Sequence, residues 1–248
     1  MTRFKLSSML FCSAFTIFLT GCGNSETTTT TTTADSANEA TPAATTPMEA
    51  NTIVTTPMSM MTVEHKVADY EKFKTVYDEH DSMRLAHGVH NYVISRGVND
   101  ANMVMVALKA DDMAKAKAFA KDASLKEAMQ KAGVTGAPTM SFANITWQDT
   151  VTLGPDVIRS RTTFTVKDWA AWEKNFVEGR QERIDNGIVD RSYGHDADDN
   201  KKIFLVTAVT DTAKAFAYYK SDALKKRREA GGVVSEPKRF LFRIVQRY

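Results

Sequence analysis

The chain has 248 residues, with 32 basic and 30 acidic side chains and a formal net charge of +2 at pH 7. Removing Arg3 and Lys5 with an N-terminal signal peptide leaves 30 of each, so the charge gives no indication of nucleic-acid binding. The mature chain then keeps only Cys22, because Cys12 lies inside the signal. This excludes a disulfide scaffold, a zinc–thiolate site and a catalytic thiol.

Residues 1–21 have the features of a secretory signal peptide. A basic start precedes a mostly apolar run over 9–19 that is too short to span a bilayer. The sequence Leu19-Thr20-Gly21-Cys22 resembles a bacterial lipobox, which implies a lipidated Cys22 at the start of the mature chain. Several acyl chains, at about 0.8 kcal/mol per buried methylene, would form a stable anchor. The alternative is an ordinary secretory signal followed by an incidental cysteine.

This N-terminus predicts a cell-envelope lipoprotein on the periplasmic side of a bacterial membrane, and leaves open whether that membrane is the inner or the outer one. Residues 22–57 are rich in Thr, Ala and Pro and contain no Lys or Arg, which predicts a disordered tether. A flexible chain of this length reaches about 30–35 Å, so the folded part can stand away from the membrane.

A duplication dominates the rest of the sequence. Residues from about Met61 to Ile145 recur 99 positions later, from Ser160 to Ile244. The matching pairs include Asp69 and Asp168, Arg84 and Arg183, Gly88 and Gly187, and Pro138 and Pro237. We therefore predict two homologous repeats, over 58–148 and 156–248, joined by about ten residues.

In the first repeat, alternation over 61–67 predicts a strand with His65 on its apolar face. Asp69 is a suitable N-cap for a helix that ends at Gly88. Two strands are expected next, over 90–95 and 103–108. The second of them contains no polar residue and should be covered on both faces.

A second helix is expected after Asp112, with a break near Asp122, because 124–127 has the Ser-x-x-Glu spacing of a capping box. Gly133 ends it, and a strand over 139–145 completes the repeat. The second repeat predicts the same order of elements over 161–166, 168–186, 189–193, 203–209, 212–230 and 239–246.

The order β-α-β-β-α-β is that of a ferredoxin-like unit, an α+β fold in which both helices cover one face of an antiparallel sheet. The other face of each sheet would be exposed unless something covered it. Two such units in one chain can pack sheet to sheet as an intramolecular barrel, and the linker of about ten residues is long enough to cross between them.

A family resemblance supports this interpretation. It is carried by His65-Lys66-Val67, Asp69-Tyr70, Phe73, Asp81, Arg84 and Gly88-Val89, with Ser124 to Met129 and Ala132-Gly133-Val134. The pattern resembles the dimeric α/β-barrel superfamily and, within it, the antibiotic-biosynthesis-monooxygenase-like domains, over both repeats. Members include cofactor-independent oxygenases, heme-handling enzymes and isomerases, so function must be argued from the site. We expect no cofactor, with heme or a metal ion as the alternative.

Aromatic residues follow one stripe of the first helix in each repeat. They are Tyr70, Phe73 and Tyr77 in the first copy, and Trp169 and Trp172 in the second. At this helical spacing they form core against the sheet or the wall of a ligand pocket between sheet and helix. One or two turns later the stripe presents Arg84 in the first copy and Arg183 in the second. Each arginine forms a structural salt bridge or binds an anion at the pocket mouth.

Histidines are concentrated in the first repeat, which suggests that only one copy has a working pocket. His65 and His80 could meet across the gap between sheet and helix, as ligands or acid–base groups, or be ordinary packed residues. His87 and His90 are weaker metal candidates, because their spacing spans a helix end and a strand start.

Three functional hypotheses follow. The first is an envelope protein that binds a small aromatic or anionic molecule without chemistry. The second is a cofactor-independent monooxygenase-like or heme-handling enzyme that uses His65, His80 and Arg84. The third is an interaction module that uses the basic run Lys225 to Arg228. An open cavity between His65, His80 and Arg84 would favour the first two hypotheses, and a packed interior would favour the third.

Overall fold

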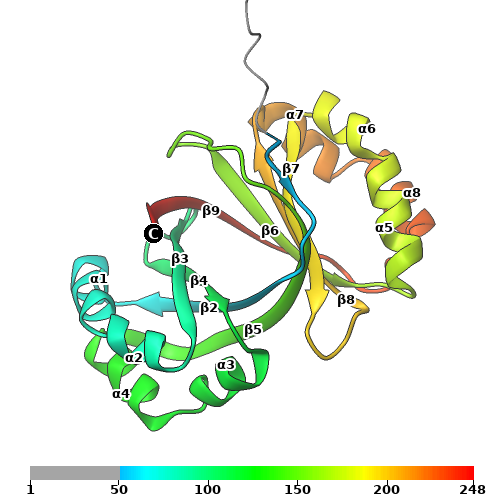
Figure 1. Cartoon of the computed structure of the whole chain (residues 1–248). Coiled ribbons are helices and arrows are strands. Elements are labelled where there is room, and N and C mark those ends of the chain that lie inside the picture. Colours follow the sequence, from blue (N-terminus) through cyan, green and yellow to red (C-terminus); the bar gives the residue numbers. More distant parts are fainter. Residues whose placement is uncertain (1–50) are drawn as a thin grey trace, which may run out of the picture. The chain divides into compact units, whose positions relative to one another are not determined.

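The computed structural model describes residues 51–248, which form eight helices and nine strands (Figure 1). The predicted signal peptide, the lipidation site Cys22 and the tether up to residue 50 lie outside the described residues. Within 51–248, no helix is both long and apolar enough to cross a bilayer.

Both repeats have the predicted order of elements. The first consists of β2 (Met58–Val67), α1 (Tyr70–Glu79), α2 (Asp81–Ala86), β3 (Val89–Gly97), β4 (Met103–Ala110), α3 (Met113–Phe119), α4 (Ala123–Lys131) and β5 (Val134–Asp149). The second consists of β6 (Ile158–Thr165), α5 (Trp169–Glu178), α6 (Arg180–Asp185), β7 (Ile188–Asp196), β8 (Lys202–Val209), α7 (Thr212–Tyr219), α8 (Asp222–Ala230) and β9 (Lys238–Arg247).

Aspartate caps start the same helices in both copies. The carboxylate of Asp69 accepts a hydrogen bond from the backbone N–H of Lys72 at the start of α1, and Asp168 caps α5 in the same way. The break predicted near Asp122 is confirmed. Its cap differs from the prediction, however, because Asp122 rather than Ser124 is the N-cap, and the Asp122 carboxylate accepts from the backbone N–H of Ser124.

The first helix of each repeat was predicted to be continuous, and this was wrong. In the first copy His80 Nδ1 lies 2.7 Å from the carbonyl oxygen of Val76, the usual partner of the backbone N–H of residue 80. That N–H turns to Asp78 instead, and the helix restarts as α2. The second copy breaks at the matching Gly179, a poor helix former. The helix predicted over 212–230 is likewise divided, because Ser221 caps a new segment, α8.

The strands form one antiparallel sheet that closes on itself. Its order is β1-β5-β2-β4-β3-β9-β6-β8-β7, and β5 also pairs with β7. The two repeats meet at β3–β9, where Val93 pairs with Arg247, and at β5–β7, where Gln148 pairs with Ser192. The predicted sheet-to-sheet packing is therefore an intramolecular α/β barrel with eight strands in the closed ring.

Helices cover the outside of this barrel, with α1 to α4 over the first repeat and α5 to α8 over the second (Figure 1). Alternate side chains of β4 are buried on opposite faces of the sheet, so this strand is covered on both faces as predicted. Val104, Val106 and Leu108 pack under the helices, whereas Ala107 lies in the core inside the barrel.

Several boundaries differ from the prediction. β5 begins at Val134, five residues before the predicted start at residue 139. The tether was expected to reach residue 57, but Ile53 and Val54 form a short strand, β1, that pairs with Asp149 and Gln148. Those partners belong to β5, which runs four residues beyond the predicted end at Ile145. The extension occurs because β7 and β1 provide hydrogen-bonding partners there, and neither pairing is local in sequence.

Candidate functional site

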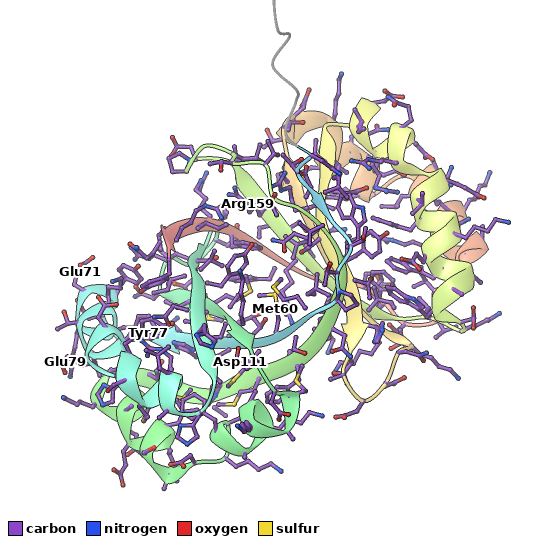
Figure 2. The ribbon with its side chains drawn as sticks, viewed as in Figure 1. Met60, Glu71, Tyr77, Glu79, Asp111 and Arg159 are labelled. Carbon is purple, nitrogen blue, oxygen red and sulfur yellow. The ribbon has the colours of Figure 1, made fainter. Side chains whose placement is uncertain are left out.

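A cavity of about 60 Å³ lies between the sheet and the helices of the first repeat. It is lined by predicted site residues from three elements and by apolar side chains around them. The predicted members are His65, Phe73, Tyr77, His80 and Arg84, and their neighbours include Met61, Val63, Met83, Phe119 and Met129. The structure therefore brings together five residues that the sequence analysis singled out, and Tyr77 lies between α1 and the sheet (Figure 2).

His65 is the unusual member of this wall. Its side chain comes from β2, is only 4% exposed, and lies with its ring 5.1 Å from that of Phe73. Both ring nitrogens are buried without a hydrogen-bond partner among the described residues. Burial lowers the pKa of His65 to about 4, so the imidazole is neutral at physiological pH. Each unpartnered buried polar atom costs about 1–3 kcal/mol, which a bound group could recover.

A polar chain closes one side of the cavity. The Tyr77 hydroxyl donates to Asn91, whose amide donates to Asp81, and Arg84 also donates to Asp81, at 3.2 Å. The Arg84 guanidinium lies 3.8 Å from the centre of the Tyr77 ring, and burial raises the pKa of that phenol. Arg84 is therefore largely engaged within the protein, although its Nε has no partner in residues 51–248.

The second repeat has a matching cavity of about 80 Å³ with different chemistry. Phe164 stands where the first copy has His65, and Trp172 and Phe176 fill the wall beside it. Arg183 forms a buried two-pronged pair with Asp190, with N···O distances of 2.8 and 2.6 Å. This arginine is fully used in holding α6 to β7.

The two cavities also differ at one pair of facing positions, where a large and a small side chain are interchanged between the repeats. His80 in the first copy faces a wall that contains Ala128. In the second copy Gly179 replaces the histidine, and Arg227 stands at the place of Ala128. A Cβ on Gly179 would lie 2.8 Å from the Arg227 side chain, so the glycine makes room for this arginine. Arg227 then pairs with Glu182 at 2.7 Å.

Other predicted residues lie outside both cavities. Tyr70 is half-buried under the Arg96 guanidinium, 4.2 Å from its ring centre. Trp169 packs between Trp172 and His195. Neither side chain lines the cavity of its own repeat.

The weaker metal candidates have separate partners. His87 Nδ1 bonds to the carbonyl oxygen of Met83, and His90 Nε2 lies 2.8 Å from Asp111. Among residues 51–248, no group of three or more His, Cys, Asp or Glu side chains could hold a metal ion.

Heme, which the family resemblance implies for some members, does not fit this site. His65 is a neutral imidazole of the kind that can ligate iron. The cavity of about 60 Å³ is nevertheless well below the roughly 300–1,000 Å³ of pockets that enclose drug-sized ligands. A macrocycle would have to displace the helices from the sheet.

A third cavity, of about 120 Å³, lies inside the barrel and was not predicted from the sequence. Arginines of the second repeat line it, among them Arg159, Arg191 and Arg247. The available signal was the alignment of the two repeats, in which these positions match Met60, Tyr92 and Gln148. Arginine at alternate positions of an otherwise buried strand, as in 159–161, marks an enclosed charged surface.

No family model matches the sequence, and no curated protein is significantly similar to it. Solved structures do resemble the fold. A "putative monooxygenase" from Fusobacterium nucleatum subsp. nucleatum ATCC 25586 matches with a TM-score of 0.50 and 11% identity, covering 76% of this chain and 93% of that one. An anthrone oxidase-like protein matches with a TM-score of 0.50 and 12% identity over 78% and 94%. The fold is thus that of the dimeric α/β barrels.

Proposed function

We propose that this protein binds a small, mainly apolar molecule with one hydroxyl or carbonyl oxygen in the first repeat's sheet–helix cavity. The observation that carries the proposal is His65, whose two ring nitrogens are buried at the cavity wall and have no partner within the described part of the chain. A neutral imidazole offers one donor and one acceptor, and the Arg84 Nε–H, which is unpaired in residues 51–248, adds another donor. An oxygen-bearing ligand would satisfy these groups.

The lining favours an aromatic ligand over an anionic one. The charge of Arg84 is already balanced by Asp81 and by the Tyr77 ring, and the remaining wall is almost wholly apolar. Met83 and Met129 are flexible side chains that can move to admit a ring larger than the cavity itself.

Binding is better supported than catalysis. The names of the similar structures suggest oxygenase chemistry, which would give His65 and His80 acid–base roles. A base with a pKa of about 4 is poorly matched to proton abstraction near neutral pH. The interaction hypothesis has less support, because two arginines of the basic run are half-buried and Arg227 is paired with Glu182.

Phenol binding by the full chain tests this proposal, with toluene as a probe of the same shape that lacks the hydroxyl. We expect phenol to shift the labelled methyl resonances of Met61, Met83 and Met129, which line this cavity, and to saturate. Toluene should bind about tenfold more weakly, because it leaves His65 without a partner.

His65→Phe is the matched substitution, because Phe164 already occupies the same place in the second repeat. This variant should fold and lose its response to phenol, whereas the exchange of half-exposed His90 for valine, its counterpart, should have no effect. A His65→Phe protein that still binds phenol with wild-type affinity would refute the assignment.

The location of the protein is a further part of the proposal, supported by the signal-like residues 1–21 and the lipobox-like sequence before Cys22. We infer a lipid anchor on the periplasmic side of a bacterial membrane. Protein produced from the full sequence should be cleaved before Cys22, partition into detergent and carry acyl chains on that cysteine by mass spectrometry. Cys22→Ala should abolish these properties, and a chain lacking acylation would contradict the anchor.

A further inference from the structure

The inside of the barrel is electrically asymmetric. The lining of its cavity includes Arg159, Arg161, Arg191 and Arg247, and a single carboxylate, Asp149. All four arginines belong to the second repeat. Their counterparts in the first repeat are uncharged, namely Met60, Thr62, Tyr92 and Gln148. The positive charge is therefore a property of one half of the barrel.

Two of the arginines are neutralised within the protein. Arg191 pairs with Asp149 at 2.9 Å and also donates to the carbonyl oxygen of Val151. Arg161 lies 3.7 Å from Glu64, and its guanidinium lies 5.0 Å from the centre of the Phe204 ring. The remaining charge comes from Arg159, which is buried, and from Arg247, which lines the cavity but is exposed to solvent.

Arg159 is a buried cation that forms no ion pair with any of residues 51–248. It is 3% exposed, and Nη1 donates to the carbonyl oxygen of Val157 at 3.0 Å. Its Nη2 is buried and has no partner among residues 51–248. Burial, and then repulsion by Arg247 and Arg191, lower the pKa of Arg159 to about 10, so it still carries its charge at neutral pH. Burying such a charge is unfavourable unless an anion is bound beside it.

The rest of the cavity is apolar. Met60, Ala107 and Phe204 belong to the hydrophobic cluster inside the barrel, and Figure 2 shows Met60 and Arg159 both directed into the enclosed space. A cavity of about 150 Å³ in another protein holds benzene, so the 120 Å³ found here is of the right order for one small ring or a short chain.

We propose that the barrel interior binds a small organic carboxylate, with its charged group against Arg159 and Arg247 and its hydrocarbon body against Met60, Ala107 and Phe204. Arginine forks match the two oxygens of a carboxylate, and the apolar floor selects against a fully hydrated inorganic anion. This site is separate from the His65 cavity, because the sheet of the first repeat lies between them.

Calorimetric titration of the full chain with benzoate, benzamide and inorganic phosphate tests the proposal. Benzoate should bind saturably and shift the labelled methyl resonances of Met60 and Met105, which line the barrel interior. Benzamide, of the same shape without the charge, and phosphate, which has charge but no hydrocarbon body, should each bind at least tenfold more weakly. Equal affinity for benzoate and benzamide, or stronger binding of phosphate, would overturn the assignment.

Arg159→Met is the decisive variant, because Met60 shows that methionine is accommodated at the matching place of this barrel. It should fold, unfold at a higher temperature than the wild type, and lose benzoate binding by at least tenfold. Arg180→Met, the same exchange at an exposed position, should keep wild-type binding. Benzoate affinity unchanged in Arg159→Met would refute the site. If benzoate shifted only the methyl resonances of Met83 and Met129, it would be bound in the His65 cavity, and the proposal would be overturned. This conclusion does not depend on the result with phenol.

Discussion

Because of His65, the free energy of unfolding of the wild type should fall by about 3 kcal/mol between pH 6.5 and pH 4, and His65→Phe should not show this loss. In the unfolded chain this histidine takes up a proton near pH 6.5, whereas burial delays protonation in the folded protein to about pH 4. Between these values the unfolded state binds more protons, so the wild type loses stability as the pH falls. Above pH 6.5 the imidazole is neutral in both states, and this contribution to pH dependence vanishes.

Urea unfolding measured from pH 8 to pH 4 checks this prediction. His65→Phe should also be about 1–3 kcal/mol more stable than the wild type at pH 7, because it removes two unsatisfied buried nitrogens. His90→Val, which removes a half-exposed imidazole and leaves His65 in place, should keep the loss of stability that His65 causes between pH 6.5 and pH 4. A His65→Phe protein with the same acid sensitivity as the wild type would show that the imidazole is not buried and neutral.

The second large effect is expected at the pair formed by Arg183 and Asp190. Asp190→Asn should destabilise the protein by about 3–5 kcal/mol, because it leaves the guanidinium buried without a carboxylate. Thermal and urea unfolding at neutral pH measure this loss. A cost below about 1 kcal/mol would mean that water reaches the arginine.

The first repeat provides the rescue for this variant. There the matching positions hold Asn91 on the strand and Asp81 at the start of α2, so the carboxylate comes from the helix instead. Adding Arg180→Asp to Asp190→Asn copies that arrangement into the second repeat. The double variant should recover a large part of the lost stability, and Arg180→Asp alone should not be stabilising. Failure of the rescue would indicate that the two repeats are not interchangeable at this point.

Much of the fold could be predicted from the sequence because each helix and strand has a counterpart in the other repeat, which gives a second, independent pattern for it. Capping aspartates and terminal glycines lie 99 residues apart, so a pattern that is ambiguous in one copy is supported by the other. The helix break at His80 was missed because it depends on a side-chain hydrogen bond to Val76 that no periodicity reveals. The true length of β5 was missed because its last residues are held by β7 and β1, which are distant in sequence.

The candidate site was only partly accessible to sequence reasoning. Helical spacing placed Tyr77 and Arg84 together, and strand alternation turned His65 towards them, and all three do line one cavity. Asp81 lies three residues before Arg84 on α2, but the spacing could not show that Asn91 of β3 and Tyr77 complete the polar chain around this pair. The barrel interior was not predicted as a site, since its arginines come from β6, β7 and β9 and form a cavity only where the sheet of the first repeat covers them.

Closure of the barrel by one polypeptide has a consequence for its assembly. A barrel built from two separate subunits dissociates when it is diluted, and its stability then depends on how many molecules are present. Here the segment between β5 and β6 keeps the halves at a high effective concentration at all times. A single molecule therefore retains both its outer cavities and its enclosed interior, even at very low protein concentration.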